Sequence, residues 1–269
     1  MRVVLNSNSF LKGRDLQILV TNDDGVNAGG LWALVKELKE VGKVTVVAPD
    51  RDQSGVGTAV TLRHPLRLTE VKPQVNGVQA YSVEGTPGDS VILALRYAVK
   101  DKIDLVVSGI NEGPNLGNDV FISGTIGGAL QGYFYGMPAI AISVAAFEGL
   151  HFAVAARLAK MLASGFQRGD LPQRLLLNVN LPNLPKEKIE GIEITKLGER
   201  SYTDKIDQGH DGKRDYYWIV RGVPEWSVVP GTDVWALEQN KISITPFHGT
   251  LDGYNPRFFQ DVSTELLGK

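Results

Sequence analysis

The stretch ILVTNDDGVNAGG, Ile18–Gly30, joins a short apolar segment to a helical pattern through two adjacent aspartates, Asp23 and Asp24. The segment Gln17–Thr21 is short and apolar, which predicts a buried strand. The following segment, Gly30–Val41, predicts a helix because its apolar residues recur at helical spacing. The two carboxylates therefore lie where a strand gives way to a helix.

The same alternation continues through about residue 182. Further apolar strands are predicted at Val44–Ala48, Ile103–Ser108, Ala139–Val144 and Leu175–Val179. Helices are predicted from Thr86-Pro87-Gly88-Asp89 through about Val99, at Gly124–Tyr135 and at Phe152–Phe166. Strands that are apolar at every position are buried on both faces, as in a parallel sheet covered by helices. We expect an α/β fold: a three-layer, Rossmann-like, mostly parallel sheet with a β-rich C-terminal extension.

The chain divides into three predicted parts: an N-terminal extension (1–15), an α/β catalytic core (16–185) and a β-rich C-terminal arm (186–269). The arm has predicted strands at Ile192–Thr195 and Ile242–Thr245, and a short helix at Thr232–Gln239. It also carries the aromatic cluster Tyr216-Tyr217-Trp218. Such an arm packs either on a neighbouring subunit or within its own chain.

Composition excludes several classes of protein. The 269 residues carry a net charge of -2, which provides no basic field for a nucleic acid polymer or an anionic membrane. The absence of cysteine excludes disulfides, thiolate metal sites and cysteine nucleophiles. No apolar run approaches the length of a membrane span, and the first residues lack the pattern of a secretory signal. We therefore expect a cytoplasmic location.

Asp23 and Asp24 fit a hard-cation site, because a bound Mg²⁺ or Mn²⁺ removes the repulsion between neighbouring carboxylates. The pair alone is equally consistent with a turn in which Asp24 caps the following helix. Ser54 and Asn111 follow the second and third strands of the core, and their oxygens could complete the coordination shell. Because ligands bind beyond the carboxyl ends of parallel strands, this convergence favours a metal site.

The segment Ser108–Gly128 is rich in Gly, Asn, Ser and Thr, and Ser123-Gly124-Thr125 opens a helix within it. Free backbone amides and the positive end of the helix dipole make such a terminus an anion site. The hydroxyls of Ser123 and Thr125 and the amide of Asn115 can add donors. The alternative is an ordinary capped helix after a long loop, but a neighbouring metal favours phosphate.

Several competing motifs are missing from the sequence. It has no GxxxxGK[ST], no GxGxxG after the first strand, no GxSxG and no HExxH. The four histidines, His64, His151, His210 and His248, are scattered, so we interpret each as structural or exposed.

Five blocks in order, ILVTNDDG, APDRDQSG, EGTPGDSV, SGINEGPNLGNDVFISGTIGGALQG and PAIAIS, resemble the SurE (stationary-phase survival protein) family of metal-dependent nucleotidases. The resemblance covers residues 17–182 and extends weakly to TDVWALEQNKISITPF in the tail. Ile122 stands where the family typically has Tyr, so any contact by that hydroxyl is missing. About fifteen residues precede the family's usual start.

The resemblance implies one divalent cation per subunit, Mg²⁺ or Mn²⁺ with others compatible, held by Asp23, Asp24, Ser54 and Asn111. It implies hydrolysis of nucleoside 5′- and 3′-monophosphates to nucleoside and phosphate, with short polyphosphate a substrate in some members. It also implies a homodimer or homotetramer that exchanges C-terminal arms.

In the expected mechanism, a metal-activated water attacks the phosphate in line, and Asn115, Ser123, Gly124 and Thr125 bind its remaining oxygens. Asp23 or Asp24 accepts the proton from water; an aspartyl-phosphate on Asp23 ranks below this route. Two other functions stay open: a nucleotide- or phosphate-binding signalling module without hydrolysis, and an acyl or sugar-group transferase. The aromatic residues Tyr217 and Trp218 are candidates for base stacking, although a core or interface role fits each better.

Overall fold

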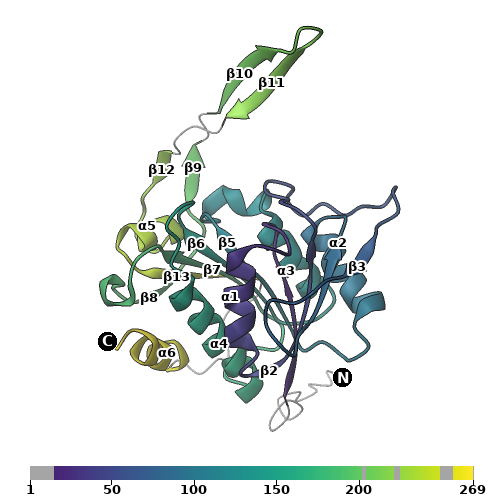
Figure 1. Ribbon diagram of the computed structural model, residues 1–269. Helices are drawn as coiled ribbons and strands as arrows, with labels where there is room; N and C mark the ends of the chain where they lie inside the picture. Colours follow the sequence, from purple (N-terminus) through teal and green to yellow (C-terminus); the bar gives the residue numbers. More distant parts are fainter. Residues whose placement is uncertain (1–14, 202–203, 221–224, 249–256, 269) are drawn as a thin grey trace, which may run out of the picture.

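The computed structural model describes residues 15–201, 204–220, 225–248 and 257–268. Its centre is a nine-stranded sheet (Figure 1). From edge to edge the strands are β3 (Leu68–Glu70), β4 (Gln79–Val83), β2 (Gly42–Pro49), β1 (Leu16–Thr21), β5 (Leu105–Glu112), β6 (Ala139–Ala145), β7 (Leu176–Pro182), β13 (Ile242–His248) and β8 (Ile192–Ile194). The strands from β4 to β7 are mutually parallel, whereas β3 and β13 run antiparallel to their inner neighbours.

Helices cover both faces of this sheet (Figure 1). The helices α1 (Gly29–Leu38) and α4 (Phe152–Arg168) pack together on one face, and α2 (Pro87–Leu93) and α3 (Gly124–Phe134) pack together on the other. Successive residues of β1 alternate between the two cores: Ile18 and Val20 join the core under α1 and α4, and Leu19 joins the core under α2 and α3. A strand buried on both faces is apolar throughout, and the predicted three-layer α/β fold is confirmed.

Most predicted boundaries hold within a few residues, with two informative exceptions. Thr86 caps α2 as expected, and its hydroxyl accepts a hydrogen bond from the Asp89 backbone N–H. The helix then changes to a π-helical turn over Ala94–Ala98. In addition, β5 continues to Glu112, so Asn111 belongs to the strand itself and not, as predicted, to a loop after it.

Two strands of the sheet were not predicted. β4 and β3 lie between β2 and α2 in the chain and form one edge of the sheet. Their residues are mostly exposed or half-buried, and Gln79, Thr69 and Glu70 are among them. An edge strand of this kind lacks the continuous apolar run that revealed the central strands.

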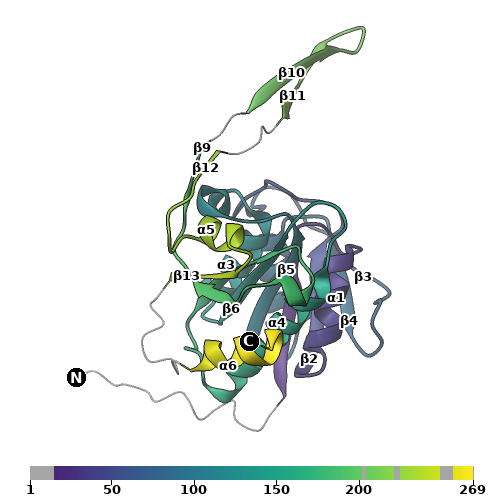
Figure 2. The same ribbon diagram turned by 90° about the vertical axis from the view of Figure 1, so that its left-hand side faces the viewer.

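The C-terminal residues contribute to the central sheet and also project from it. β13 pairs with β7, and β8 pairs with β13, so both lie within the main body. The short strands β9 (Glu199–Ser201) and β12 (Glu225–Ser227) pair with each other and lead to a hairpin of β10 (Lys205–His210) and β11 (Asp215–Val220). This hairpin extends away from the body in both views (Figure 2).

The C-terminal part also contains two helices, α5 (Asp233–Glu238) and α6 (Phe258–Leu267). Thr232 caps α5, close to the predicted short helix. α6 was not predicted; it packs on α4 through buried residues that include Phe258 and Val262. Residues 1–14, which make up almost all of the predicted N-terminal extension, lie outside the described residues.

Candidate active site

Asp23 and Asp24 lie at the carboxyl end of β1, before α1 begins at Gly29. The backbone around them is fixed from both sides. The Asn22 side-chain amide donates to the Gly25 carbonyl oxygen at 3.0 Å, and the Gln53 backbone N–H donates to the Asp23 carbonyl oxygen at 2.7 Å. The second contact brings the loop after β2 to the aspartate pair, as parallel strands require.

Asp23 is held against the N-terminus of α3. The Thr125 hydroxyl donates to Oδ1 of Asp23 at 2.5 Å, and both residues are buried. A Cβ atom added to Gly124 would lie 2.8 Å from Cβ of Asp23 and 3.0 Å from its Oδ2, closer than ordinary van der Waals contact. The first residue of α3 must therefore be glycine for Asp23 to occupy this place. Burial raises the pKa of the Asp23 carboxyl to about 6, although hydrogen bonds from Thr125 oppose the shift.

Asp24 is half-buried and has one unsatisfied, buried oxygen. Its Oδ2 atom is buried and has no hydrogen-bond partner among the described residues. Burial raises the pKa of the Asp24 carboxyl to about 8, and the neighbouring charges of Asp23, Glu112 and Asp52 raise it as well. An unpartnered buried carboxylate oxygen beside further carboxylates is costly unless a cation compensates it.

Asn111 presents its side chain at the end of β5, beside β1 in the sheet. The Nδ2 atom of Asn111 donates to the Gly113 carbonyl oxygen at 2.7 Å. This bond fixes the amide and leaves Oδ1 as the atom that can coordinate a cation. The charge of the adjacent Glu112 raises the pKa of the Asp24 carboxyl, so the structure brings the Asn111 segment close to the aspartate pair.

Ser54 lies on the exposed loop that follows β2. Its hydroxyl and its backbone N–H both donate to Oδ1 of Asp52, at 2.5 and 2.7 Å. The charge of Asp52 acts on both Asp23 and Asp24, which places this loop beside the pair. Ser54 is thus near the aspartates, with its hydroxyl directed at another carboxylate.

The predicted phosphate contacts surround the start of α3. Ser123 is the N-cap, and its hydroxyl oxygen accepts from the Ile126 backbone N–H at 3.2 Å, so its hydrogen remains available to donate. The Thr125 hydroxyl is committed to Asp23, which leaves its contribution to an anion to the backbone N–H. The Asn115 side-chain amide donates to Ser143 at 3.0 Å and to Thr125 at 3.4 Å.

These residues fit a hard divalent cation. The unpartnered Oδ2 of Asp24, the adjacent Asp23 carboxylate and the Asn111 amide oxygen are all oxygen donors of the type that Mg²⁺ and Mn²⁺ prefer. The part of the chain that the structure describes contains no group of three His, Cys, Asp or Glu residues arranged for a metal. A site here therefore combines two carboxylates with neutral oxygens and water, which suits Mg²⁺ because it keeps several waters.

Several polar residues of the site escaped the sequence interpretation. Asp52 and Glu112 add negative charge beside the pair. Asn178 and Asn180 on β7 both donate to the Asn115 carbonyl oxygen, at 2.8 and 3.0 Å. Polar residues within otherwise apolar strands were the available signal, because a strand buried on both faces has no ordinary place for asparagine.

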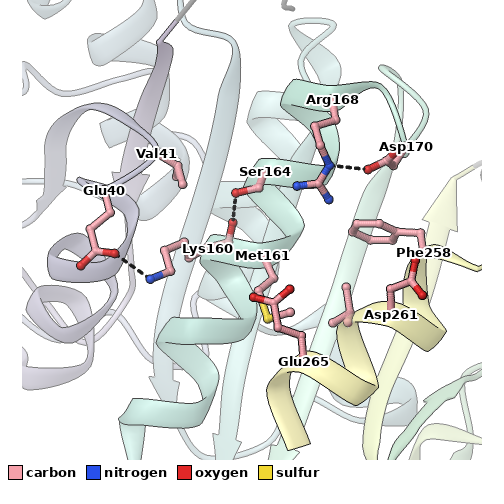
Figure 3. A pocket seen from close by; sticks show the side chains of 11 residues that line it. Glu40, Val41, Lys160, Met161, Ser164, Arg168, Asp170, Phe258, Asp261 and Glu265 are labelled. Atoms are coloured by element: carbon pink, nitrogen blue, oxygen red, sulfur yellow. Dashed lines mark hydrogen bonds and ion pairs between the residues drawn. The ribbon is translucent and has the colours of Figure 1, made fainter. Parts of the chain in front are cut away.

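A cavity of about 420 Å³ lies elsewhere, between the end of α1, α4 and α6 (Figure 3). Glu40 and Val41, which lead from α1 into β2, place it at the amino edge of the sheet, opposite the aspartates. Two ion pairs line it: Lys160 with Glu40 at 2.7 Å, and Arg168 with Asp170 at 2.7 Å. The first joins α4 to the segment after α1, the second lies within the segment that ends α4, and neither belongs to the aspartate site.

The profile of the family "Survival protein SurE" matches residues 18–204, more than half of the chain. The chain belongs to the SurE family.

Relatives within the SurE family align with most of this chain. A protein of Dehalococcoides mccartyi named 5′-nucleotidase SurE is 46% identical over 251 residues, covering 93% of this chain and 95% of its own. The 5′-nucleotidase SurE of Moorella thermoacetica is 46% identical over 239 residues, covering 88% and 92%. The crystal structure of the SurE protein from Aquifex aeolicus aligns with a TM-score of 0.72 at 38% identity, over 93% of this chain and 99% of that one.

The SurE assignment agrees with the remaining sequence predictions that the structure describes. His64, His151 and His210 are exposed and lie outside the aspartate site, while the side chain of His248 falls outside the described part. No described helix is both long and apolar enough to cross a membrane.

Proposed function

We propose that this SurE-family chain is a metal-dependent 5′-nucleotidase, which hydrolyses nucleoside 5′-monophosphates to nucleoside and phosphate. The observation that carries the proposal is the buried, unpartnered Oδ2 of Asp24 beside Asp23, at the N-terminus of α3. A cation-binding pair next to a helix terminus is suited to a phosphate ester. The names of relatives 46% identical support the same activity.

The proposed metal ligands are Asp23, Asp24, Asn111 and Ser54. When bound, a divalent cation supplies Lewis acidity and lowers the pKa of a coordinated water. Ser54 must turn its hydroxyl oxygen from Asp52 toward the pair to take part, directly or through water. Asp23 is positioned for this role by Thr125, because a hydrogen bond to a ligating carboxylate fixes its orientation.

The remaining residues bind and orient the phosphate. The amides of Gly124 and Thr125 lie in the first turn of α3, and the Ser123 hydroxyl can donate beside them. These donors are fixed before substrate arrives, so they stabilise the charge that develops on phosphate oxygens. Asn115 supports this turn through Thr125 and can contact phosphate only by giving up one of its present bonds. One carboxylate of the pair, Asp23 or Asp24, accepts the proton of the attacking water.

The experiment measures inorganic phosphate released from a panel of nucleoside 5′- and 3′-monophosphates and short polyphosphate, with Mg²⁺, Mn²⁺ or EDTA. Metal-dependent release from the 5′-esters is expected, and the panel determines whether 3′-esters and polyphosphate are also substrates. Folded protein that binds nucleotides but releases no phosphate with any cation would contradict the proposal and indicate a binding module.

We also propose that the chain forms a homodimer or homotetramer through its C-terminal arm. The hairpin β10–β11 exposes a group of large apolar side chains: Ile206, Tyr216, Tyr217, Trp218 and Ile219. An isolated two-stranded hairpin is marginally stable in water. Successive residues of a strand point to opposite faces, so the hairpin exposes large apolar side chains on both of its faces, as expected of an element that packs against another chain.

A further inference from the structure

Phe147 is an exposed aromatic residue at the carboxyl edge of the sheet. It lies between the end of β6 at Ala145 and the start of α4 at Phe152, and the residue is 76% exposed. A single exposed phenylalanine is ordinary on a protein surface. The contacts of Phe147, however, connect it to a proposed metal ligand.

The ring of Phe147 packs on the backbone that supports Asn111. A Cβ atom added to Gly113 would lie 2.4 Å from Cε1 of Phe147, so the ring rests directly against that glycine. Gly113 also has φ +111°, a conformation that other residues rarely adopt. The carbonyl oxygen of Gly113 accepts the bond from Nδ2 of Asn111 at 2.7 Å. One residue therefore separates the ring from a proposed metal ligand.

We infer that Phe147 is the stacking surface for the base of the nucleotide, an inference that rests on the proposed nucleotidase function. The phosphate of the substrate lies at the aspartates and α3, and its sugar and base extend beyond the sheet edge. Stacking of the base on an exposed aromatic ring beside that point contributes favourable binding free energy. Stacking uses the π-face that every base has, so Phe147 favours nucleotides over phosphate esters that lack a base.

Two other exposed phenylalanines allow the inference to be tested. Phe134 is 61% exposed and lies at the end of α3, about 15 Å along the helix from Gly124, the residue that contacts Asp23. It is the matched control for removal of an exposed ring. Phe121 is 69% exposed and lies two residues before Ser123, so it is the alternative stacking surface.

The test compares adenosine 5′-monophosphate with ribose 5-phosphate, which has the same ester and sugar without the base. KM and dissociation constants are measured for the wild type, Phe147→Ala, Phe147→Trp, Phe121→Ala and Phe134→Ala. Phe147→Ala should lower the preference for the nucleotide by roughly 5- to 140-fold, the loss expected for one stacked base. Phe147→Trp should keep the preference, and Phe134→Ala should leave it unchanged.

Three results would overturn the inference. Phe147→Ala could keep the wild-type preference, it could weaken both ligands equally through Gly113 and Asn111, or Phe121→Ala alone could lose the preference. Failure of the proposed function is distinguishable, since the wild type would then release no phosphate from either ester. Dissociation constants of the same variants would still decide whether the base stacks on Phe147.

Discussion

The Thr125 hydroxyl donates a hydrogen bond of 2.5 Å to Oδ1 of Asp23, joining residues 102 positions apart in the chain. This bond connects the carboxyl end of β1 to the first turn of α3. It links the proposed metal site to the proposed phosphate site, because the residue that orients the carboxylate also lies in the first turn of the helix that faces the anion.

Removing that hydroxyl should weaken metal binding. Thr125→Val keeps the size of the side chain but leaves Asp23 without its donor, and we expect Mn²⁺ affinity to fall roughly 10- to 100-fold. Isothermal titration of the purified protein measures the loss. The control is Thr61→Val, which removes a similar bond of 2.7 Å to Asp89 and should leave Mn²⁺ affinity unchanged. Wild-type affinity in a folded Thr125→Val protein would show that the bond does not position the ligand.

A methyl group on Gly124 should displace Asp23. The added Cβ of Gly124→Ala would lie 2.8 Å from Cβ of Asp23. Either the Asp23 carboxylate or the start of α3 must therefore shift. We expect phosphate release and Mn²⁺ affinity to fall at least about tenfold, as for loss of an orienting contact. Gly29→Ala at the start of α1 is the control, because its nearest neighbour lies 3.8 Å away. If Gly124→Ala only raised the melting temperature through better helix propensity, the proposed close approach would be wrong.

Metal affinity should rise with pH. The pKa values of about 6 for Asp23 and about 8 for Asp24 mean that protons must leave before a cation binds. Mn²⁺ affinity should therefore increase between pH 6 and pH 8, with proton release that titration in buffers of different ionisation enthalpy detects. Equal affinity at both pH values would contradict the pKa shifts.

The same shifts affect the stability of the metal-free protein. Both folded-state pKa values lie above the ordinary 3.8, so folding favours the protonated carboxyls. Their contribution to the free energy of unfolding is complete below about pH 4 and is lost as pH rises toward 8. Thermal unfolding in EDTA should show that Asp24→Asn reduces the loss of stability with rising pH. An unchanged loss would argue against a raised pKa of Asp24.

The hairpin β10–β11 should control the oligomeric state. Trp218 and Ile219 are 66% and 72% exposed, and replacing both with serine should dissociate the assembly. Analytical ultracentrifugation measures the change against Tyr97→Ser, which alters an exposed ring on the body of the protein. A wild-type protein that is monomeric, or an assembly unaffected by the double substitution, would refute the role of the hairpin.

Local pattern was enough to predict the central fold. The run Gln17–Thr21 and the cap at Thr86 are decided within a few residues, and both appear in the structure as expected. The missed elements have two causes. β3 and β4 form a polar edge of the sheet, whose pairing depends on β2. α6 does have apolar residues at helical spacing, Phe258, Val262 and Leu266, but the helix was not predicted.

The candidate site was predictable as a set of residues but not as a set of contacts. The sequence indicates that Asp23, Asp24 and Asn111 reach one edge of a parallel sheet. It cannot show that Thr125 donates to Asp23, since that bond depends on how α3 packs on the sheet. For the same reason Ser54 was predicted as a ligand without its bond to Asp52.

We propose above all that Asp23 and Asp24 hold a cation required for phosphate release. The most direct measurement follows Mn²⁺ binding and phosphate release from adenosine 5′-monophosphate in the same samples of wild type and Asp23→Asn. We expect the wild type to bind Mn²⁺ and release phosphate, and to stop when EDTA is added. The folded Asp23→Asn protein should do neither at the same Mn²⁺ concentration. Full phosphate release by Asp23→Asn, or by the wild type in EDTA, would contradict the account.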